Sequence, residues 1–283
     1  NIRYAIAQDN NHGTSEAAAL FIGGNWLAKT NTSFPRKRES SETNQWKRYD
    51  HFAHQGRKWL ENRVEKLVEE DGSFSQHSVT YHRVLLDTLI FAEHWRKKLG
   101  AAPFSATFYD RARAVLDWMI SFTDTTSGHA PNLGANDGAM LLHAHACDYR
   151  DFRPSIQTAS VLFYGRKQYA EGPWDEPGFW LGLNGAASAL ENNAFVSFPR
   201  RRESSVSNCI VDSRTRDFAC PRGYQVIREN DHSKSGTGAV KQNKTSQVFP
   251  GGYVVMTGKA SWGMIRFPMY RFRPGHNDVF HFD

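Results

Sequence analysis

The sequence predicts an α+β protein, in which a helical region is followed by an antiparallel β region. Up to about residue 190, apolar side chains recur at the three- and four-residue spacing of helices. From about residue 221, short β-branched and aromatic runs stand between Gly and Pro residues, as is typical of strands. We therefore expect a helical domain over 1–195, a linker over 196–220 and a β domain over 221–283.

Several of the expected helices carry recognisable end signals. Glu16 stands in the first turn of the first helix, which also has a Ser/Thr start. The third helix ends in cationic residues before Gly100, and Pro154 suits the first position of the fifth. Helices in such close succession favour hairpins stacked around an axis, an α/α toroid. The expected ranges are 14–28, 45–69, 78–99, 104–122, 154–169 and 175–190.

The β domain is expected to contain strands at 223–227, 252–256 and 261–267. The polar segment 229–246 is rich in Gly, Ser and Lys, so we expect a mobile loop there. The chain begins without Met and ends inside an expected strand, and we therefore expect it to be a fragment of a longer protein.

Two nearly identical segments explain most of the net charge. Residues 33–41 read SFPRKRESS and residues 197–205 read SFPRRRESS, so eight of nine positions are identical. Each copy has three basic residues and one Glu, and together the copies supply +4 of the net charge of +6. The basic charge is therefore weak evidence for an anionic partner, and no nucleic-acid partner is expected. The first copy lies in 29–43, which contains Pro35 and is expected to be a solvated loop.

Composition limits the remaining classes. No run approaches the roughly 18 apolar residues of a membrane helix, so no membrane span is expected. Cys147, Cys209 and Cys220 lack the spacing of a metal site. Cys209 and Cys220 can pair as a disulfide or remain free thiols. An aromatic content of 13% is enough to line a groove.

The first candidate site is Asn11-His12, at the start of an expected helix. Backbone amides exposed at a helix start, an amide side chain and an imidazole together suit a carboxylate ligand. Glu16 lies four residues after His12 on the same helical face, where it can orient and charge the imidazole. The structural alternative is that Asn11 caps the helix, His12 is a surface residue and Glu16 is a favourable first-turn acid.

The second candidate site is Tyr81-His82-Arg83, at the start of another expected helix. Adjacent cations lower the pKa of a tyrosine below its usual value of about 10, which would let Tyr81 act as a base near neutral pH. In the structural alternative, Tyr81 faces the core while His82 and Arg83 are solvated.

Two further segments carry polar groups that suit a binding cleft. Asn136 and Asp137 belong to the Gly- and Asn-rich loop 132–138. Asp151 and Arg153 can clamp a substrate anion or form a structural ion pair, and we favour the ion pair.

The last segment, Arg273 to Asp278, stands between β runs. His276 can be catalytic, and His276 with Asp278 and His281 can hold a metal ion. Three such residues without a fourth ligand are weak evidence for zinc.

Five motifs in one order carry a resemblance to a known family: NNHGTSEAAALF, DGSFSQHSVTYHR, NLGANDGAMLL, DFRPSIQ and RPGHNDVFHFD. They resemble the heparinase II/III-type polysaccharide lyases, a group that includes alginate lyases. The resemblance covers nearly the whole chain outside the two repeated segments. It implies an α/α toroid, here incomplete, followed by the start of an antiparallel β-sandwich. It also implies a periplasmic or extracellular carbon–oxygen lyase that cleaves a uronate-containing polysaccharide by β-elimination without a cofactor.

The resemblance also implies residue roles. Asn11 with His12 would neutralise the uronate carboxylate, which makes an enolate-like intermediate accessible. Tyr81 would remove the C5 proton and protonate the leaving oxygen, and His276 would approach the same cleft. Substrate contacts are expected from Glu16, His82, Arg83, Asn136, Asp137, Arg153 and Arg273.

One spacing departs from the family pattern. Asn11 and Tyr81 are 70 residues apart, and the first repeated segment lies between them. Removing about 15 residues around that segment restores the family's spacing, and loops tolerate such insertions because closure costs rise slowly with length. Both repeated segments resemble translated repetitive DNA elements and are expected to be loop insertions.

Two other functions compete with the lyase. A glycoside hydrolase on an α/α toroid needs two carboxylates facing the sugar, for which Glu16, Asp137 and Asp151 are candidates. A non-catalytic polysaccharide-binding protein would keep an aromatic groove and lose nothing when Tyr81 is changed.

Overall fold

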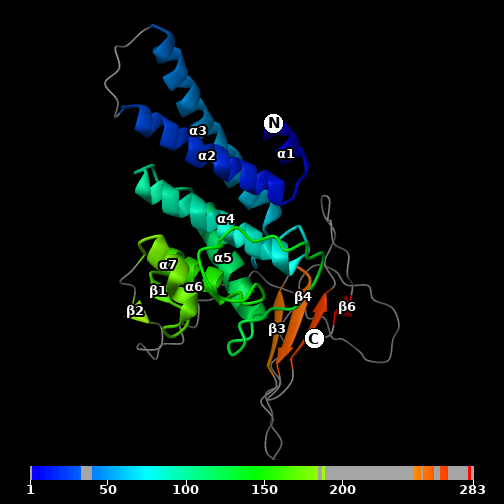
Figure 1. Cartoon of the computed structure of the whole chain (residues 1–283). Helices are drawn as coiled ribbons and strands as arrows, with labels where there is room; N and C mark the ends of the chain where they lie inside the picture. The colour runs from blue at the N-terminus through cyan, green and yellow to red at the C-terminus, as the bar shows by residue number, and fades with distance from the viewer. Residues whose placement is uncertain are drawn as a thin grey trace, which may run out of the picture.

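The computed structural model describes residues 2–32, 40–183, 187–188, 245–249, 251–257, 262–266 and 280–281. It confirms the α+β class, because helices make up the first part and an antiparallel sheet the last (Figure 1). The helices are α1 (Ile2–Ala7), α2 (Asn11–Thr32), α3 (Ser40–Leu67), α4 (Val79–Lys98), α5 (Ala106–Phe122), α6 (Arg153–Tyr164), the 3-10 helix η1 (Pro173–Asp175) and α7 (Glu176–Trp180). The strands are β1 (Arg166–Lys167), β2 (Ala187–Ser188), β3 (Thr245–Phe249), β4 (Tyr253–Thr257), β5 (Trp262–Arg266) and β6 (Phe280–His281).

The helical predictions are confirmed in position for α2 to α6, with three corrections at their ends. The loop expected over 29–43 is wrong at both ends, because α2 continues to Thr32 and α3 already begins at Ser40, while 33–39 lie outside the described residues. The fifth helix ends at Tyr164, since Gly165 adopts a left-handed conformation with φ of 70°. The helix expected over 175–190 is reduced to η1 and α7. Helix α1 was not predicted.

Helices α2 and α3 form an antiparallel hairpin with unusually close backbones. A Cβ atom on Gly24 would collide with the backbone of Ala53, and one on Gly56 would collide with the backbone of Phe21. Both glycines are therefore needed for this approach. The hairpin lies at the top of Figure 1, with its far ends at Thr32 and Ser40. The last two residues of the first repeated segment, Ser40 and Ser41, belong to α3, and its residues 33–39 lie outside the described residues.

Strands β3 to β6 form one antiparallel sheet in chain order. The strands expected at 252–256 and 261–267 are confirmed as β4 and β5, and β6 confirms the strand expected at the end of the chain. Strand β3 was not predicted, and its first two residues fall in the loop expected over 229–246. The strand expected at 223–227, the linker 196–220 and the second repeated segment lie outside the described residues.

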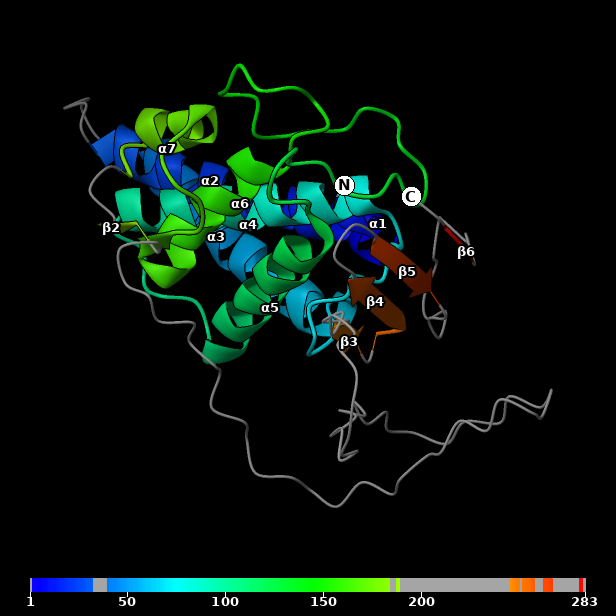
Figure 2. The same cartoon turned by 90° about the horizontal axis from the view of Figure 1, so that it is seen from below.

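The sheet shares a hydrophobic core with the helices. Phe249, Tyr253, Val255 and Met264 are buried in the same cluster as the apolar faces of α2 to α6. The Tyr253 ring meets Trp118 of α5 edge-on at 5.4 Å. Figure 2 shows the sheet beside α5 and below the start of α4. No helix within the described residues is long and apolar enough to cross a membrane.

Candidate functional site

The start of α2 is capped by Asn10, so the side chain of the neighbouring Asn11 is not the helix cap. The Asn10 Oδ1 accepts a hydrogen bond from the backbone N–H of His12 at 3.0 Å. The structural alternative, in which Asn11 is the cap, is therefore wrong. The backbone N–H of Asn11 donates to Gln76 Oε1 at 3.0 Å, across 65 residues of sequence. Among the described residues, the side-chain amide of Asn11 makes no hydrogen bond, so it can serve a ligand.

The turn before Asn10 is fixed by charge. Asp9 adopts a left-handed conformation with φ of 49°, which a short polar side chain tolerates better than most. Its Oδ1 accepts from Arg63 Nη1 at 2.7 Å and from Lys66 Nζ at 3.1 Å. Both cations belong to α3, so the hairpin holds the entry to α2 in place.

His12 and Glu16 lie on one face of α2, as their spacing predicts. The His12 Nδ1 and Glu16 Oε1 atoms are 3.8 Å apart, and both side chains are exposed. An exposed pair of this kind contributes little to stability. The pair is therefore open to a ligand.

The start of α4 presents Tyr81 to the loop that follows α5. Ser78 caps the helix by accepting from the backbone N–H of Tyr81. The Tyr81 hydroxyl donates to Asp137 Oδ2 at 2.5 Å. This hydrogen bond to a carboxylate, burial, and the charges of Asp137 and Tyr149 raise the pKa of Tyr81 to about 12. The expectation that neighbouring cations lower the pKa of Tyr81 is therefore wrong.

His82 is buried rather than solvated. Its ring stacks on Trp118 at a centroid distance of 4.0 Å, and Nε2 lies 3.1 Å from the Val115 carbonyl oxygen. Burial lowers the pKa of His82 to about 4, so the ring is neutral near pH 7. With only 2% of its surface exposed, His82 offers no atom to a polysaccharide, and its expected substrate contact is corrected to a packing role.

Arg83 is buried as well, on the face of α4 turned toward the loop that follows α5. Its Nη1 donates to the Tyr149 carbonyl oxygen at 2.6 Å. The guanidinium lies over the rings of Tyr149 and Phe152, at 4.5 and 4.4 Å from their centroids. Burial lowers the pKa of Arg83. The expected contact of Arg83 with substrate is therefore replaced by contacts within the protein.

The loop residues Asn136 and Asp137 are exposed and lie beside the start of α4. Asn136 Oδ1 accepts from the Tyr149 hydroxyl at 2.7 Å, and its Nδ2 donates to Asn132 Oδ1 at 2.9 Å. Gly134 makes the close approach possible, because a Cβ atom there would collide with the backbone of His77. The structure therefore brings Asn136, Asp137 and Tyr81 together.

Asp151 and Arg153 form the ion pair that we favoured. Arg153 donates from Nε and Nη2 to the two carboxylate oxygens of Asp151, at 2.9 and 2.8 Å. The guanidinium also lies 3.9 Å from the centroid of the Trp174 ring. Both side chains of the pair are largely buried, so the expected contact of Arg153 with substrate is corrected to a structural role.

One residue that sequence reasoning missed links the helices to the sheet. His77 is buried, and its Nδ1 lies 3.1 Å from the Tyr253 hydroxyl oxygen, across 176 residues of sequence. The His77 carbonyl oxygen accepts from Arg266 Nη1 at 3.2 Å. His77 lies in the motif DGSFSQHSVTYHR, directly before the helix cap Ser78, and this position is the one sequence feature that could have drawn attention to it. No local pattern could have indicated its partner on β4.

Part of the predicted site lies outside the described residues: Arg273, His276 and Asp278, together with Cys209 and Cys220. Cys147 is a free, half-buried thiol. Across the described ranges, no group of three or more His, Cys, Asp or Glu side chains is arranged to hold a metal ion. Of the three zinc ligands expected there, His276 and Asp278 lie outside the described residues, and His281 lies in β6.

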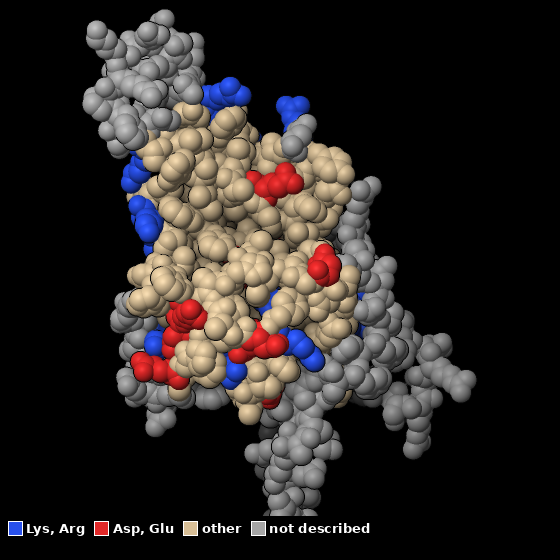
Figure 3. All heavy atoms as spheres, viewed as in Figure 1, with Lys and Arg blue, Asp and Glu red and all other residues tan. Residues whose placement is uncertain are grey.

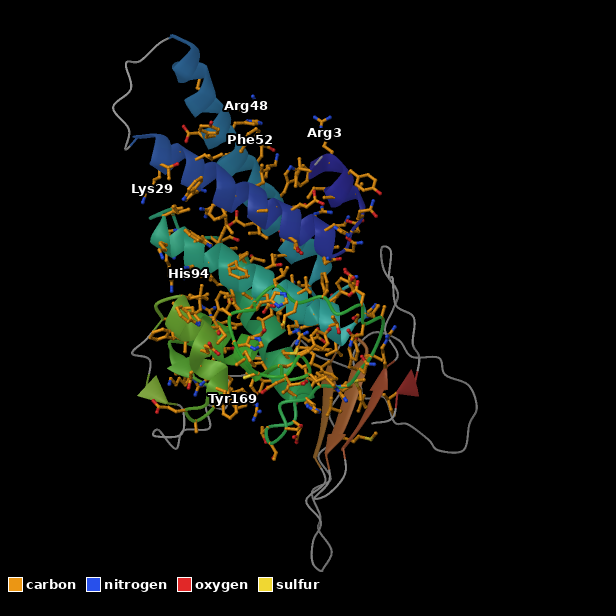
Figure 4. The ribbon with its side chains drawn as sticks, in the orientation of Figure 1. Arg3, Lys29, Arg48, Phe52, His94 and Tyr169 are labelled. Carbon is orange, nitrogen blue, oxygen red and sulfur yellow. The ribbon has the colours of Figure 1, made fainter. Side chains whose placement is uncertain are left out.

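Two surface hollows lie away from these residues. One of about 590 Å³ is lined by residues around α7, and one of about 540 Å³ lies between α3 and the start of α5. Neither is lined by a residue of the predicted site. Around the start of α4, packed side chains fill the space toward the sheet (Figure 4). On the face in Figure 3, acidic and basic side chains form small separate groups with wide uncharged areas between them.

Comparisons with protein-family models, with curated proteins and with solved structures found no match for this chain.

Proposed function

We propose that the chain is a polysaccharide lyase of the heparinase II/III type, which cleaves a uronate-containing polysaccharide by β-elimination. In this proposal its helices belong to an α/α toroid and its sheet to an antiparallel β-sandwich, and the protein works in the periplasm or outside the cell. The observation that carries the proposal is the meeting of two helix starts. The contacts of Asn11 with Gln76 and of Ser15 with Thr88 set α2 beside α4, with their first turns at the same end (Figure 1).

The carboxylate of the uronate would bind at the start of α2. The Asn11 amide is not used for capping, and it stands where the helix dipole favours an anion. His12 adds an exposed imidazole one residue later, with Glu16 at 3.8 Å from its Nδ1 atom. Neutralising the carboxylate stabilises the negative charge that develops when the C5 proton leaves.

Tyr81 would carry the proton. As a phenolate it takes the proton from C5, the electron pair of that bond forms the C4–C5 double bond, and the C4–O4 bond breaks. The same proton then passes from Tyr81 to O4, and the phenolate is restored. Because the pKa of Tyr81 is raised, its phenolate is rare near neutral pH but is a stronger base than an ordinary tyrosinate. The neutral phenol can in turn donate its proton to the leaving O4 alkoxide.

The proposal is tested by ultraviolet absorbance of the unsaturated uronate product. The purified protein is incubated with alginate, heparan sulfate, hyaluronan and bacterial exopolysaccharides. We expect absorbance to rise on at least one of these polymers, and Tyr81→Phe to lower that rate by at least about 100-fold. Tyr109→Phe is the matched control, because the Tyr109 hydroxyl also donates to a carboxylate, that of Glu93 at 3.0 Å, away from the candidate site.

Other outcomes separate the competing functions. New reducing ends without a gain in absorbance would identify a glycoside hydrolase. Binding without cleavage would identify a polysaccharide-binding protein. Full lyase activity in Tyr81→Phe would overturn the role given to Tyr81.

A further inference from the structure

The loop over residues 129–151, hereafter the α5–α6 loop, has no regular secondary structure and is attached to α4 at successive turns. Figures 1 and 2 show it in green, running past the start of α4. The isolated bridge between His129 and Asp151 closes its two ends. Hydrogen bonds join it to α4 and to the helix cap at five residues: Ser78 Oγ to Ala135, Val79 N–H to Leu133, Tyr81 to Asp137, Arg83 to Tyr149, and Asp87 to Leu141 and Leu142.

Among the residues that bind the α5–α6 loop, Asp87 is the most completely buried. Its side chain has no exposed surface. Oδ2 accepts from the backbone N–H groups of Leu141 at 3.3 Å and Leu142 at 3.1 Å. Oδ1 accepts from Ser155 Oγ of α6 at 2.6 Å. A buried carboxylate is costly unless its oxygens are hydrogen-bonded, so these donors account for its presence in the core.

Arg83 stands one turn before Asp87 and holds the other end of the same stretch. It donates to the Tyr149 carbonyl oxygen and lies against the Tyr149 ring. The Tyr149 hydroxyl then reaches back to Asn136 at 2.7 Å. Burial raises the pKa of Asp87, and its hydrogen bonds and the positive charge of Arg83 offset part of this shift. The stretch between Leu141 and Tyr149 is thus held at both ends by buried side chains of α4, Asp87 and Arg83.

We propose that Asp87, assisted by Arg83, is a positioning residue that holds the α5–α6 loop so that Asp137 meets the hydroxyl of Tyr81. This inference rests on the proposed function, because it gives Asp87 a part in placing the proton-transfer group. Asp87 touches neither Tyr81 nor any group placed at the substrate. It acts through the backbone of Leu141 and Leu142, four and five residues beyond Asp137.

The test compares two substitutions of Asp87 with one of its hydrogen-bond partner Ser155. Asp87→Ala removes the acceptor of both loop amides. In Asp87→Asn the Oδ1 atom can accept from the loop while Nδ2 donates to the Ser155 hydroxyl, whose hydrogen can rotate away. Ser155→Ala is the matched control, because it truncates the same buried contact without removing a bond to the loop. If Asp87→Ala does not fold, Asp87→Leu replaces it, since leucine fills the space and still provides no acceptor.

Amide hydrogen exchange and the titration of Tyr81 are the readouts, and neither requires lyase activity. In Asp87→Ala we expect exchange over residues 139–145 to accelerate at least about tenfold, with exchange in α2 and α3 unchanged. The Tyr81 ¹³Cζ resonance should then titrate at lower pH than in the native protein. Asp87→Asn and Ser155→Ala should remain within about threefold of native exchange.

Two results would overturn the inference. One is equal loop exchange in Asp87→Ala and Ser155→Ala. The other is a Tyr81 titration that stays at its native position while the loop loosens. A protein that proves not to be a lyase, yet shows the expected exchange and titration, would refute the proposed function and leave the positioning of Tyr81 intact.

Discussion

Replacing Asp137 with asparagine should change the acidity of Tyr81 more than any other single change in the loop. The carboxylate accepts the Tyr81 hydroxyl at 2.5 Å and is the largest cause that raises the Tyr81 pKa from 10.0 to about 12. Asparagine removes the negative charge and leaves a weaker acceptor of nearly the same shape. The full shift corresponds to a factor of about 100 in phenolate population at a given pH. Because Tyr81 is only half-buried, solvent screening reduces this, and we expect a fall of about 1 to 2 pH units.

The measurement is a pH titration of protein labelled with ¹³Cζ-tyrosine. Tyr81→Phe identifies the Tyr81 resonance. In the native protein this resonance should stay constant up to about pH 10.5, and in Asp137→Asn it should titrate between about pH 10 and 11. The matched control is Asp148→Asn, which removes an exposed carboxylate from the same loop while keeping the acceptor for the Arg150 N–H.

A Tyr81 resonance that does not titrate below pH 11 in Asp137→Asn would refute the reasoning. So would an equal shift in Asp148→Asn, because the effect would then be general electrostatics rather than the hydrogen bond. If the lyase proposal holds, the rising limb of its pH–rate profile should move to lower pH in Asp137→Asn. That shift would link the hydrogen bond to the base form of Tyr81.

Three further predictions concern stability and are checked by urea unfolding. Gly72→Ala should lower the free energy of unfolding by at least about 3 kcal/mol, because a Cβ atom at φ of 90° would collide with the Ala114 carbonyl. Gly138→Ala, at φ of 80°, places its Cβ atom in open space and should lower it by only about 1 kcal/mol. Equal losses would contradict the close approach at Gly72. The pKa of His82 is lowered to about 4 by burial, so its contribution is present above pH 6.5 and is lost as pH falls through 4, by about 3 kcal/mol. In His82→Phe this loss should vanish, and an unchanged acid dependence would show that His82 is not its source. Burial raises the pKa of Asp117 to about 6, so its contribution to stability is present below about pH 3.8 and is lost as pH rises through 6, by up to about 3 kcal/mol. Asp117→Asn should remove this opposite slope between pH 4 and 6, and an unchanged slope would contradict the assignment to Asp117.

Local sequence patterns determined most of the secondary structure. The apolar spacing around Val84, Leu85 and Leu89 predicts α4 because one turn of helix brings such residues to one face, and all three are buried. The short runs that became β4 and β5 were recognisable for the same local reason. The predicted helix boundaries are wrong where a contact distant in sequence, or a small local difference, decides where the helix begins or ends. The start of α2 depends on which of two adjacent asparagines faces the helix, and α7 is short although its composition suits a longer helix.

The sequence by itself therefore determined which segments are helices or strands, and it pointed to Asn11, His12 and Tyr81 as chemically suited residues. Only the tertiary structure decided what surrounds them. Asp137 lies 56 residues from Tyr81 and reverses the expected direction of its pKa shift. His82 and Arg83 are buried rather than solvated: His82 packs on Trp118, and Arg83 donates a hydrogen bond to the α5–α6 loop. The physical reason is that electrostatic and burial effects depend on distance in space, and the α5–α6 loop sets those distances through attachments that no local pattern records.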